Sequence, residues 1–249
     1  GSIGAIWNSG TINSDVGPAI TSTGSGASVG TIRNDGWIGG GMTIANQNLV
    51  VVGPALGSGF GVFAGGTIAV GNGSLEFASG FTFLGSDIVA SNLAGTAGAG
   101  AVTNAGILAL IDLRTLDGSF IQTGTATFES IISSPTDYGS LAITGSAALA
   151  GFLDLVISDP SPLAAGQIYE LFSFDSYTGG FSGLSVGQTP LTSLGPGQWA
   201  YDSFILQEVW TPTSMSLSVT AVPEPSTYAM AIAGLACGGY SMFRRRKRA

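Results

Sequence analysis

The chain has 249 residues, with 15 acidic and 7 basic side chains, one cysteine and no histidine, and only 9% of it is charged. Without histidine, Ser-His and Cys-His catalysis and histidine metal ligation are excluded, and a pI near 4.1 argues against nucleic acid as a partner. The length and the 45% hydrophobic content are sufficient for a folded core and argue against ordinary disorder.

Residues 1–137 are rich in glycine and contain short apolar runs with no sustained helical period. Clusters of Gly, Asn, Ser and Asp separate these runs, and this alternation predicts β-strands. The predicted strands include Thr43-Ile44, Leu49–Val52, Gly66–Val70, Leu75–Phe77, Phe81–Leu84 and Ile107–Ile111.

A degenerate repeat runs through the same part of the chain. The pattern Asn, small residue, Gly, any residue, aliphatic residue begins at Asn8, Asn34 and Asn104. The first interval fits one coil of a stacked structure, and the second fits three coils of roughly 23 residues. Gly-Thr-Ile also recurs, at 10–12, 30–32 and 66–68.

Coils of this length predict a right-handed parallel β-helix with three short strands per coil. Asn and Gly tolerate the left-handed backbone of sharp corners, and stacked asparagines can bond one another in a ladder. The Asn-x-Gly pattern resembles the passenger β-helices of autotransporter adhesins. A β-sandwich or jelly roll is the alternative fold, because Asn-x-Gly also serves simple hairpins.

Residues 138–221 have a different texture, with longer apolar and aromatic runs such as Tyr138–Leu155, Ala164–Phe172 and Gly179–Phe181. This order resembles the last coils and closing cap of autotransporter-like β-helices. A cap is physically required, because an open last coil would expose strand edges to further pairing. We therefore expect a set of aromatic side chains to form cap core rather than a sugar-stacking platform: Tyr169, Phe172, Phe174 and Trp199.

Candidate catalytic groups in residues 1–221 are few. Asp112, Arg114 and Asp117 form the one acid–base group suggested by sequence spacing, and we expect Asp112 and Arg114 to share one face of a strand as a solvated ion pair. Asp154 and Asp159 are also close in sequence, but a glycosidase needs two carboxylates across one bond, which spacing alone does not establish. Calcium-loop repeats and a phosphate-binding loop are missing from the sequence, and no cofactor is predicted.

The charge is divided between two parts of the chain. Residues 1–221 hold 14 acidic and 2 basic side chains, a net charge of −12. The other basic residues are consecutive, at Arg244, Arg245, Arg246, Lys247 and Arg248. An uncharged apolar stretch precedes them, and its anchor positions are Tyr228, Ala231, Ile232, Leu235 and Phe243.

This apolar stretch predicts a short transmembrane helix, whose basic flank places the C-terminus in the cytoplasm. A buried C-terminal helix with a solvated tail is the alternative. Cys237 lies inside the stretch, where a small apolar filler is the expected role and palmitoylation the alternative. With a single cysteine, no intramolecular disulfide can form.

A stiff, extended segment stands immediately before the helix: Val222, Pro223, Glu224 and Pro225. The order of this motif, an apolar helix and a basic tail resembles the PEP-CTERM sorting signal of exopolysaccharide-producing Gram-negative bacteria. The resemblance covers residues 222–249. It implies recognition by a membrane-embedded exosortase, processing near Pro-Glu-Pro, and delivery from the inner membrane to the cell surface or extracellular matrix.

The sequence therefore predicts an exported, non-enzymatic surface or matrix protein with a structural or adhesive role linked to exopolysaccharide or to self-association. Because such a signal needs prior export, we also expect that a signal peptide, and N-terminal coils with it, preceded Gly1. The alternative is a surface lyase or hydrolase that acts on polysaccharide.

Overall fold

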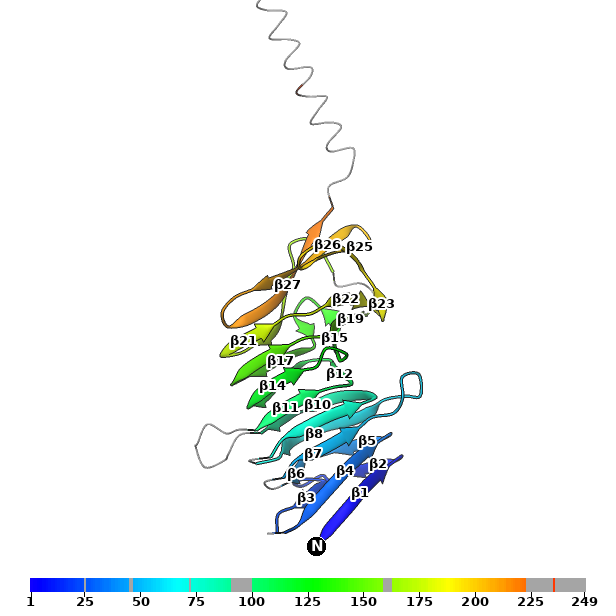
Figure 1. Ribbon diagram of the computed structural model, residues 1–249. Coiled ribbons are helices and arrows are strands. Elements are labelled where there is room, and N and C mark those ends of the chain that lie inside the picture. Colours follow the sequence, from blue (N-terminus) through cyan, green and yellow to red (C-terminus); the bar gives the residue numbers. More distant parts are fainter. Residues whose placement is uncertain are drawn as a thin grey trace, which may run out of the picture.

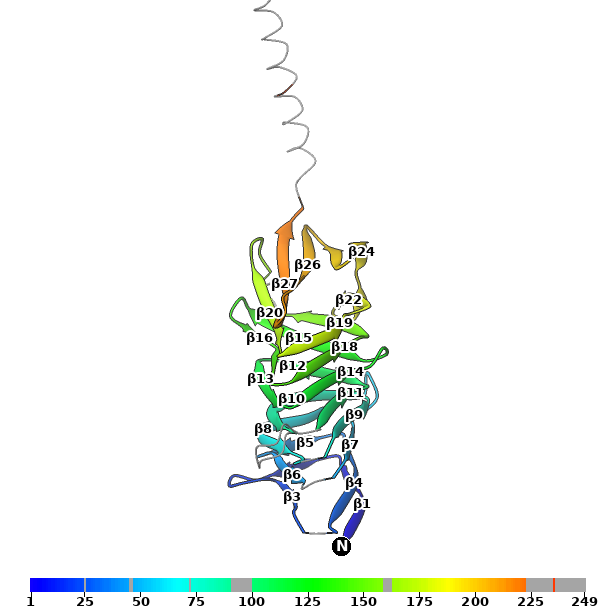
Figure 2. The same cartoon turned by 60° about the vertical axis from the view of Figure 1, so that its left-hand side comes forward.

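The computed structural model describes residues 1–24, 26–44, 47–71, 73–90, 100–158, 163–222 and 235. These residues form an elongated all-β stack, with the N-terminus at one end and the last strands at the other (Figures 1 and 2). The predicted all-β class is confirmed. The strands fall into three columns, which we call A, B and C.

Column A is an eight-stranded sheet in which every neighbouring pair is parallel. Each strand pairs with one from the next layer of the stack, so backbone groups are satisfied between layers rather than within them. Its strands, in stacking order, are β1 (Ser2–Asn8), β4 (Ser28–Asn34), β7 (Leu49–Val52), β9 (Leu75–Ser79), β11 (Ala101–Asn104), β14 (Ser119–Gln122), β18 (Ser146–Leu149) and β21 (Ser176–Gly179).

Columns B and C are also parallel and merge in the middle of the stack, where two long strands belong to both. Column B contains β2 (Thr11–Asn13), β5 (Trp37–Gly39), β8 (Gly61–Ala69), β10 (Phe81–Val89), β12 (Ile107–Leu110), β15 (Thr127–Ser134), β19 (Phe152–Ile157) and β22 (Gly183–Val186). Column C contains β3 (Ile20–Ser22), β6 (Met42–Ile44), the second halves of β8 and β10, β13 (Leu113–Asp117), β17 (Ser140–Ile143) and β20 (Ile168–Ser173).

The two halves of the long strands meet at a bend. In β8 the bend is at Gly65 and Gly66, whose φ values of +64° and +63° favour glycine. In β10 the pairing register shifts between Gly85 and Asp87. The bends let one strand continue from column B into column C without a separate corner.

The core lies between the columns and is built from side chains in register. Leu108, Phe128, Leu153 and Leu184 are consecutive partners along column B and are all buried. Burial alternates along β10, as expected for a strand with one inward face. Most of the core is aliphatic, so the stack needs few charged side chains inside.

The C-terminal end is closed by antiparallel strands. The hairpin strands β23 (Thr189–Pro190), β24 (Thr192–Gly195), β25 (Gln198–Tyr201), β26 (Phe204–Trp210) and β27 (Ser214–Ala221) follow β22, and the short β16 (Asp137–Tyr138) folds back on β15. β27 also pairs antiparallel with β20 and so covers the end of column C.

The aromatic residues expected in the cap are buried. Tyr169 and Phe172 are fully inaccessible, and Phe174 and Trp199 are 4% and 6% exposed. Phe172 of β20 packs on Phe128 of β15 with ring centroids 4.4 Å apart, which joins columns C and B just below the cap. Their prediction as core is confirmed.

Each predicted strand coincides with an observed one, but the runs Gly66–Val70 and Ile107–Ile111 each extend one residue past the strand that contains them, β8 and β12. The run predicted from Gly66 is the second half of β8, which begins at Gly61. The three Gly-Thr-Ile segments do not occupy equivalent positions, since they lie at the start of β2, within β4 and within β8, in three different columns. Parallel pairing continues past residue 138, through β22.

The C-terminal predictions fall mostly outside the described residues. Val222 follows β27 and is 42% exposed, and Leu235 is 78% exposed. Within the described part of the chain, no helix has the length and hydropathy that a membrane crossing requires. The remaining predicted motif, anchor and tail positions lie outside that part: Pro223, Glu224, Pro225, Tyr228, Ala231, Ile232, Cys237, Phe243, Arg244, Arg245, Arg246, Lys247 and Arg248.

Candidate functional site

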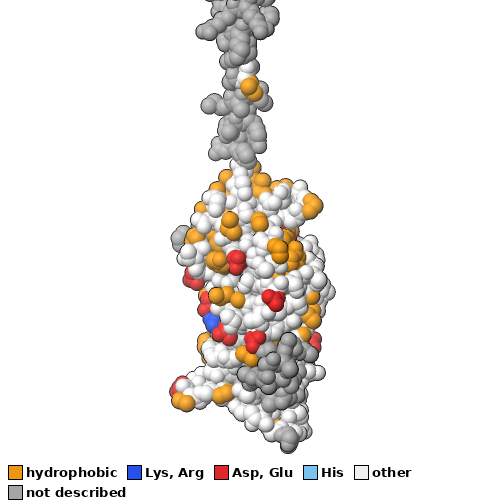
Figure 3. Space-filling view, turned by 90° about the vertical axis from the view of Figure 1, so that its left-hand side faces the viewer, with side chains coloured by type: hydrophobic (Ala, Val, Ile, Leu, Met, Phe, Trp, Pro, Cys, Tyr) orange, Lys and Arg blue, Asp and Glu red, His pale blue; other side chains and the backbone are white. Residues whose placement is uncertain are grey.

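The acid–base group suggested by sequence is an ion pair at a corner. Arg114 Nε donates to Asp112 Oδ1 at 2.7 Å and its Nη2 donates to Asp112 Oδ2, with the two side chains 21% and 44% exposed. Asp117 is turned to another partner, accepting from Thr144 Oγ1 at 2.9 Å. The predicted ion pair is confirmed, but Asp112 precedes β13 (Leu113–Asp117), so the two residues do not share a strand face as predicted. Acidic side chains are otherwise scattered on the face shown in Figure 3.

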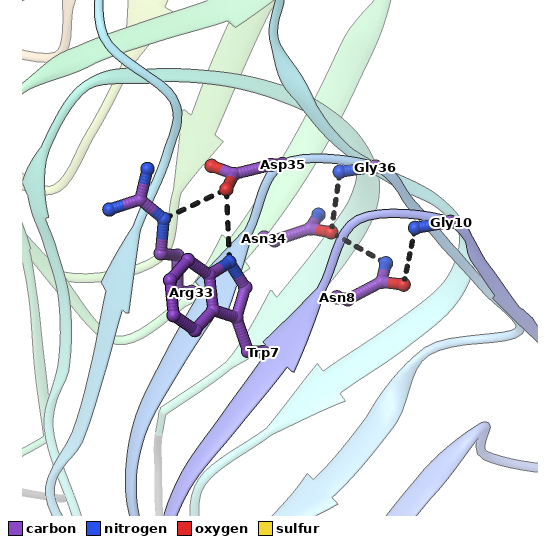
Figure 4. Close-up of polar contacts among 7 residues, drawn as sticks. All are labelled: Trp7, Asn8, Gly10, Arg33, Asn34, Asp35 and Gly36. Carbon is purple, nitrogen blue, oxygen red and sulfur yellow. Dashed lines mark hydrogen bonds and ion pairs between the residues drawn. The ribbon is translucent and has the colours of Figure 1, made fainter.

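The asparagine repeat forms the corners between columns A and B (Figure 4). Asn8 and Asn34 are direct partners in β1 and β4, and Asn8 Nδ2 donates to Asn34 Oδ1 at 2.8 Å, so the predicted ladder is confirmed there. Each Oδ1 also accepts from the glycine two residues on, at Gly10 and Gly36.

The ladder is interrupted and then resumes in a changed form. Asn104 ends β11, the third strand beyond β4 in column A, as the spacing predicts, but β7 and β9 between them contain no asparagine. Asn104 bonds Gln122 instead, and Gln122 donates to the carbonyls of Ala150 and Phe152 in the next layer. The interval is 26 residues at Asn8–Asn34 and 18 at Asn104–Gln122, so the layers differ in length.

A second cluster in Figure 4 surrounds Trp7, which is 73% exposed. The Arg33 guanidinium lies 5.1 Å from the Trp7 ring centroid and donates to Asp35 Oδ2 at 2.8 Å, and Trp7 Nε1 donates to the same oxygen at 3.1 Å. The Arg33 bond, more than the Trp7 bond, lowers the pKa of Asp35. Both arginines of the described chain are therefore engaged in ion pairs.

A pair of buried carboxyl groups lies on the outer side of column B. Glu129 in β15 and Asp154 in β19 are direct partners across parallel strands, and they are 4% and 1% exposed. Adjacent strands are about 4.8 Å apart, so the two acids share one small volume. Burial first, and then the charge of Asp154, raises the pKa of Glu129 to about 7.

Asp154 is held by the turn that starts the cap. Its Oδ1 accepts from Ser185 Oγ and from the backbone N–H of Gln188 at 2.9 Å. Gly187 and Gln188, with φ of +56° and +65°, form the two-residue connection between β22 and β23 that aims this N–H. Asp154 Oδ2 is buried and accepts no hydrogen bond within the described chain.

The acid pair opens into a cavity of about 370 Å³, which we call the cap pocket. Leu56 comes from the loop before β8, Phe152 from β19 and Trp199 from the cap strand β25. Serine and threonine side chains supply further polar groups: Thr127, Ser182, Ser185 and Ser193. The pocket thus combines apolar walls with a proton donor and an acceptor.

Sequence reasoning did not find this pair, since it compared Asp154 with Asp159, which is outside the described residues. The available signal was the layer interval, because Glu129 and Asp154 are separated by nearly the 26 residues that separate Asn8 and Asn34. In the described chain no three His, Cys, Asp or Glu side chains form a metal-binding group. The chemistry available in the cap pocket is therefore that of two acids and several hydroxyls.

Comparisons with known proteins do not add a family assignment. No protein-family model matches the chain, and searches of curated proteins and of solved structures find no similar protein. Function is therefore inferred from the sequence motifs and from the geometry of the stack and the cap pocket.

Proposed function

We propose that the chain is an exported, non-enzymatic protein of the cell surface or extracellular matrix, with a right-handed parallel β-helix as its body. In this proposal columns A, B and C are the three faces of the helix, and the antiparallel strands are its cap. The parallel, layer-to-layer pairing of all three columns supports it. A body whose backbone groups bond between layers suits a durable displayed scaffold.

The observation that carries the proposal is the position of the Val-Pro-Glu-Pro segment relative to the cap. The N–H of Val222 donates to Ser203 O at 2.9 Å, and Val222 is the first residue of the Val-Pro-Glu-Pro segment. The Pro-Glu-Pro motif therefore begins directly after a residue bonded to the cap. A processing enzyme could act there without unfolding the body.

The C-terminal segment is proposed to act as a PEP-CTERM sorting signal. An exosortase in the inner membrane recognises Pro223-Glu224-Pro225, the apolar stretch from Tyr228 to Phe243 holds the precursor, and the basic tail keeps the C-terminus in the cytoplasm. The mature protein reaches the surface or matrix of a Gram-negative bacterium. There it associates with exopolysaccharide or with further copies of itself.

Glu224→Ala tests the sorting proposal in a host that carries an exosortase. We expect the variant to accumulate as full-length protein in the inner membrane, as judged by fractionation and immunoblotting. Glu170→Gln, an exposed acid of the body, is the matched control and should be processed normally. Normal processing of the Glu224→Ala variant would contradict the proposal.

A second candidate, a polysaccharide-cleaving enzyme, is favoured by one observation, the pairing of Glu129 with Asp154. A protonated carboxyl beside a carboxylate is the arrangement that glycosidases use as acid and nucleophile. Release of reducing ends from host polysaccharide, lost in Glu129→Gln and Asp154→Asn but retained in Asp112→Asn, would establish this candidate. Lack of release by the native protein would favour the structural role.

A further inference from the structure

We infer that the cap pocket is a binding site for one neutral sugar ring of a surface glycan, held between the Glu129–Asp154 pair and the exposed apolar walls formed by Phe152 and Leu56. The inference rests on the proposed surface role for the choice of a glycan as the natural source of the ring. The site itself is argued from four features of the pocket.

The first feature is unsatisfied hydrogen-bonding capacity at the floor. Asp154 is only 1% exposed to solvent, yet its Oδ2 accepts no hydrogen bond within the described chain. Glu129, its partner in β15, is 4% exposed. Buried polar atoms are nearly always paired, so the Asp154 oxygen points to a ligand that brings a hydroxyl group.

The second feature is the match between the floor and a hydroxyl group. Since the pKa of Glu129 is about 7, its carboxyl donates a proton in neutral or mildly acidic solution, while Asp154 Oδ2 beside it has no hydrogen-bond partner in the described chain. A donor beside an acceptor suits a sugar hydroxyl, which both accepts and donates. Ser185 and the Gln188 N–H fix the acceptor in place before a ligand arrives.

The third feature excludes anionic ligands. No lysine or arginine lines the pocket, and the two arginines of the described chain are paired with Asp35 and Asp112 elsewhere. A uronic acid or phosphate would therefore face the acid pair without a compensating cation, which is unfavourable in a partly desolvated site.

The fourth feature is the shape and character of the walls. Phe152 is 45% exposed and Leu56 is 57% exposed, so apolar surface is open to solvent at the pocket, and Trp199 lies in the cap beside them. Rings of this kind pack on the C–H face of a pyranose. The volume of about 370 Å³ is within the range of small-molecule pockets and suits one ring with its substituents.

The test uses the full chain in a zwitterionic detergent without a sugar headgroup. Methyl glucoside, methyl galactoside and methyl mannoside are titrated at pH 6, with glucuronic acid and calcium chloride as the anionic and metal probes. Binding is followed by tryptophan fluorescence and by saturation-transfer NMR. We expect at least one neutral methyl hexoside to bind in the millimolar range, and glucuronic acid and calcium to show no binding that depends on Asp154.

The variants separate the roles of the side chains. Asp154→Asn and the exposed-wall variant Phe152→Ala should each weaken binding at least tenfold, while Asp175→Asn, an exposed acid, should leave it unchanged. Because binding uses the protonated form of Glu129, affinity of the native protein should fall about tenfold from pH 6 to pH 8. Glu129→Gln keeps a donor and an acceptor at both pH values, so its affinity should not change with pH.

The proposal is overturned if no neutral hexoside binds, if glucuronic acid binds more tightly than all three, or if calcium alone binds in an Asp154-dependent way. The Phe152→Ala arm does not disturb a buried core position, so it remains decisive if Asp154→Asn folds poorly. None of these measurements involves processing of the C-terminal segment. Failure of sugar binding would therefore leave the Glu224→Ala result intact. Normal processing of Glu224→Ala would likewise leave the sugar-binding result intact.

Discussion

Glu129 is the residue whose burial has the clearest thermodynamic consequence. Its pKa is about 7 in the folded chain and 4.5 when exposed, so between these values the folded state holds a proton that the unfolded state has lost. The free energy of unfolding therefore falls as pH rises from about 4.5 to about 7 and then levels off. After allowance for solvent screening, we expect a loss of about 2 kcal/mol from this group.

Urea unfolding at pH 5 and pH 8 measures this loss. Burial also raises the pKa of Glu208, so in every variant this residue makes the free energy of unfolding fall further as pH rises. The difference in pH dependence between the native protein and Glu129→Gln therefore isolates the contribution of Glu129. We expect the smaller pH dependence in Glu129→Gln and the native pH dependence in the control Glu170→Gln. Equal slopes in all three proteins would show that Glu129 ionises in the fold as freely as in water.

The raised pKa could not be predicted from the sequence, because it depends on which strand lies beside β15. The repeat at Asn8 and Asn34 gave the correct partner for those residues, but the interval then changes to 18 residues at Asn104–Gln122. A fixed interval of 23 residues does not align Glu129 with Asp154, whereas the interval between Asn8 and Asn34 nearly does. Because the interval varies from layer to layer, the sequence does not indicate which interval applies at Glu129.

At the scale of elements, the corner between columns A and B decides how tightly layers stack. A Cβ atom on Gly36 would lie 2.1 Å from the carbonyl oxygen of Gly10 in the layer below, whereas a Cβ on Gly10 meets nothing within 4 Å. Gly36→Ala should therefore force the layers apart and cost about 2–3 kcal/mol of unfolding free energy. Gly10→Ala, at the equivalent corner one layer earlier, should change it by less than about 1 kcal/mol.

Chemical denaturation of the two variants beside the native protein checks this difference. Similar stability of Gly36→Ala and Gly10→Ala would mean that the corner relaxes without loss of unfolding free energy, and that neighbouring layers are not in rigid contact.

The Asn-x-Gly pattern was sufficient to predict these corners from sequence, because its side-chain bond and its glycine act locally. Column membership of the Gly-Thr-Ile segments was not predictable, because the same short strand fits any of the three columns.

At the scale of the molecule, the stack tolerates a charged content of 9% because its backbone bonds run between layers and its interior is aliphatic. The same arrangement leaves a strand edge wherever stacking stops. The cap was expected from a resemblance and from the need to cover strand edges, and the residues expected to be buried there, among them Tyr169 and Phe172, are buried. The antiparallel pairing of β27 with β20 was not predictable, since it joins segments distant in sequence.

The cap is expected to prevent association of the stack through its C-terminal end. Leu217 in β27 is fully buried and is the partner of Tyr169 in β20, so Leu217→Lys places a charge in the cap core and should detach β27 at a cost of about 3–5 kcal/mol. The exposed edge of β20 would then pair with other copies. Sedimentation velocity should show larger, concentration-dependent species in Leu217→Lys than in the native protein.

Thr220→Lys is the matched control, because it adds the same charge to an exposed position of the same strand. It should sediment like the native protein and keep the native tryptophan fluorescence, to which the buried Trp199 of the cap contributes. If Leu217→Lys loses the buried Trp199 signal and yet sediments like the native protein, β27 does not act as a barrier to pairing. In that case the end of the stack is protected by the shortness of its last strands, such as the four-residue β21 and β22.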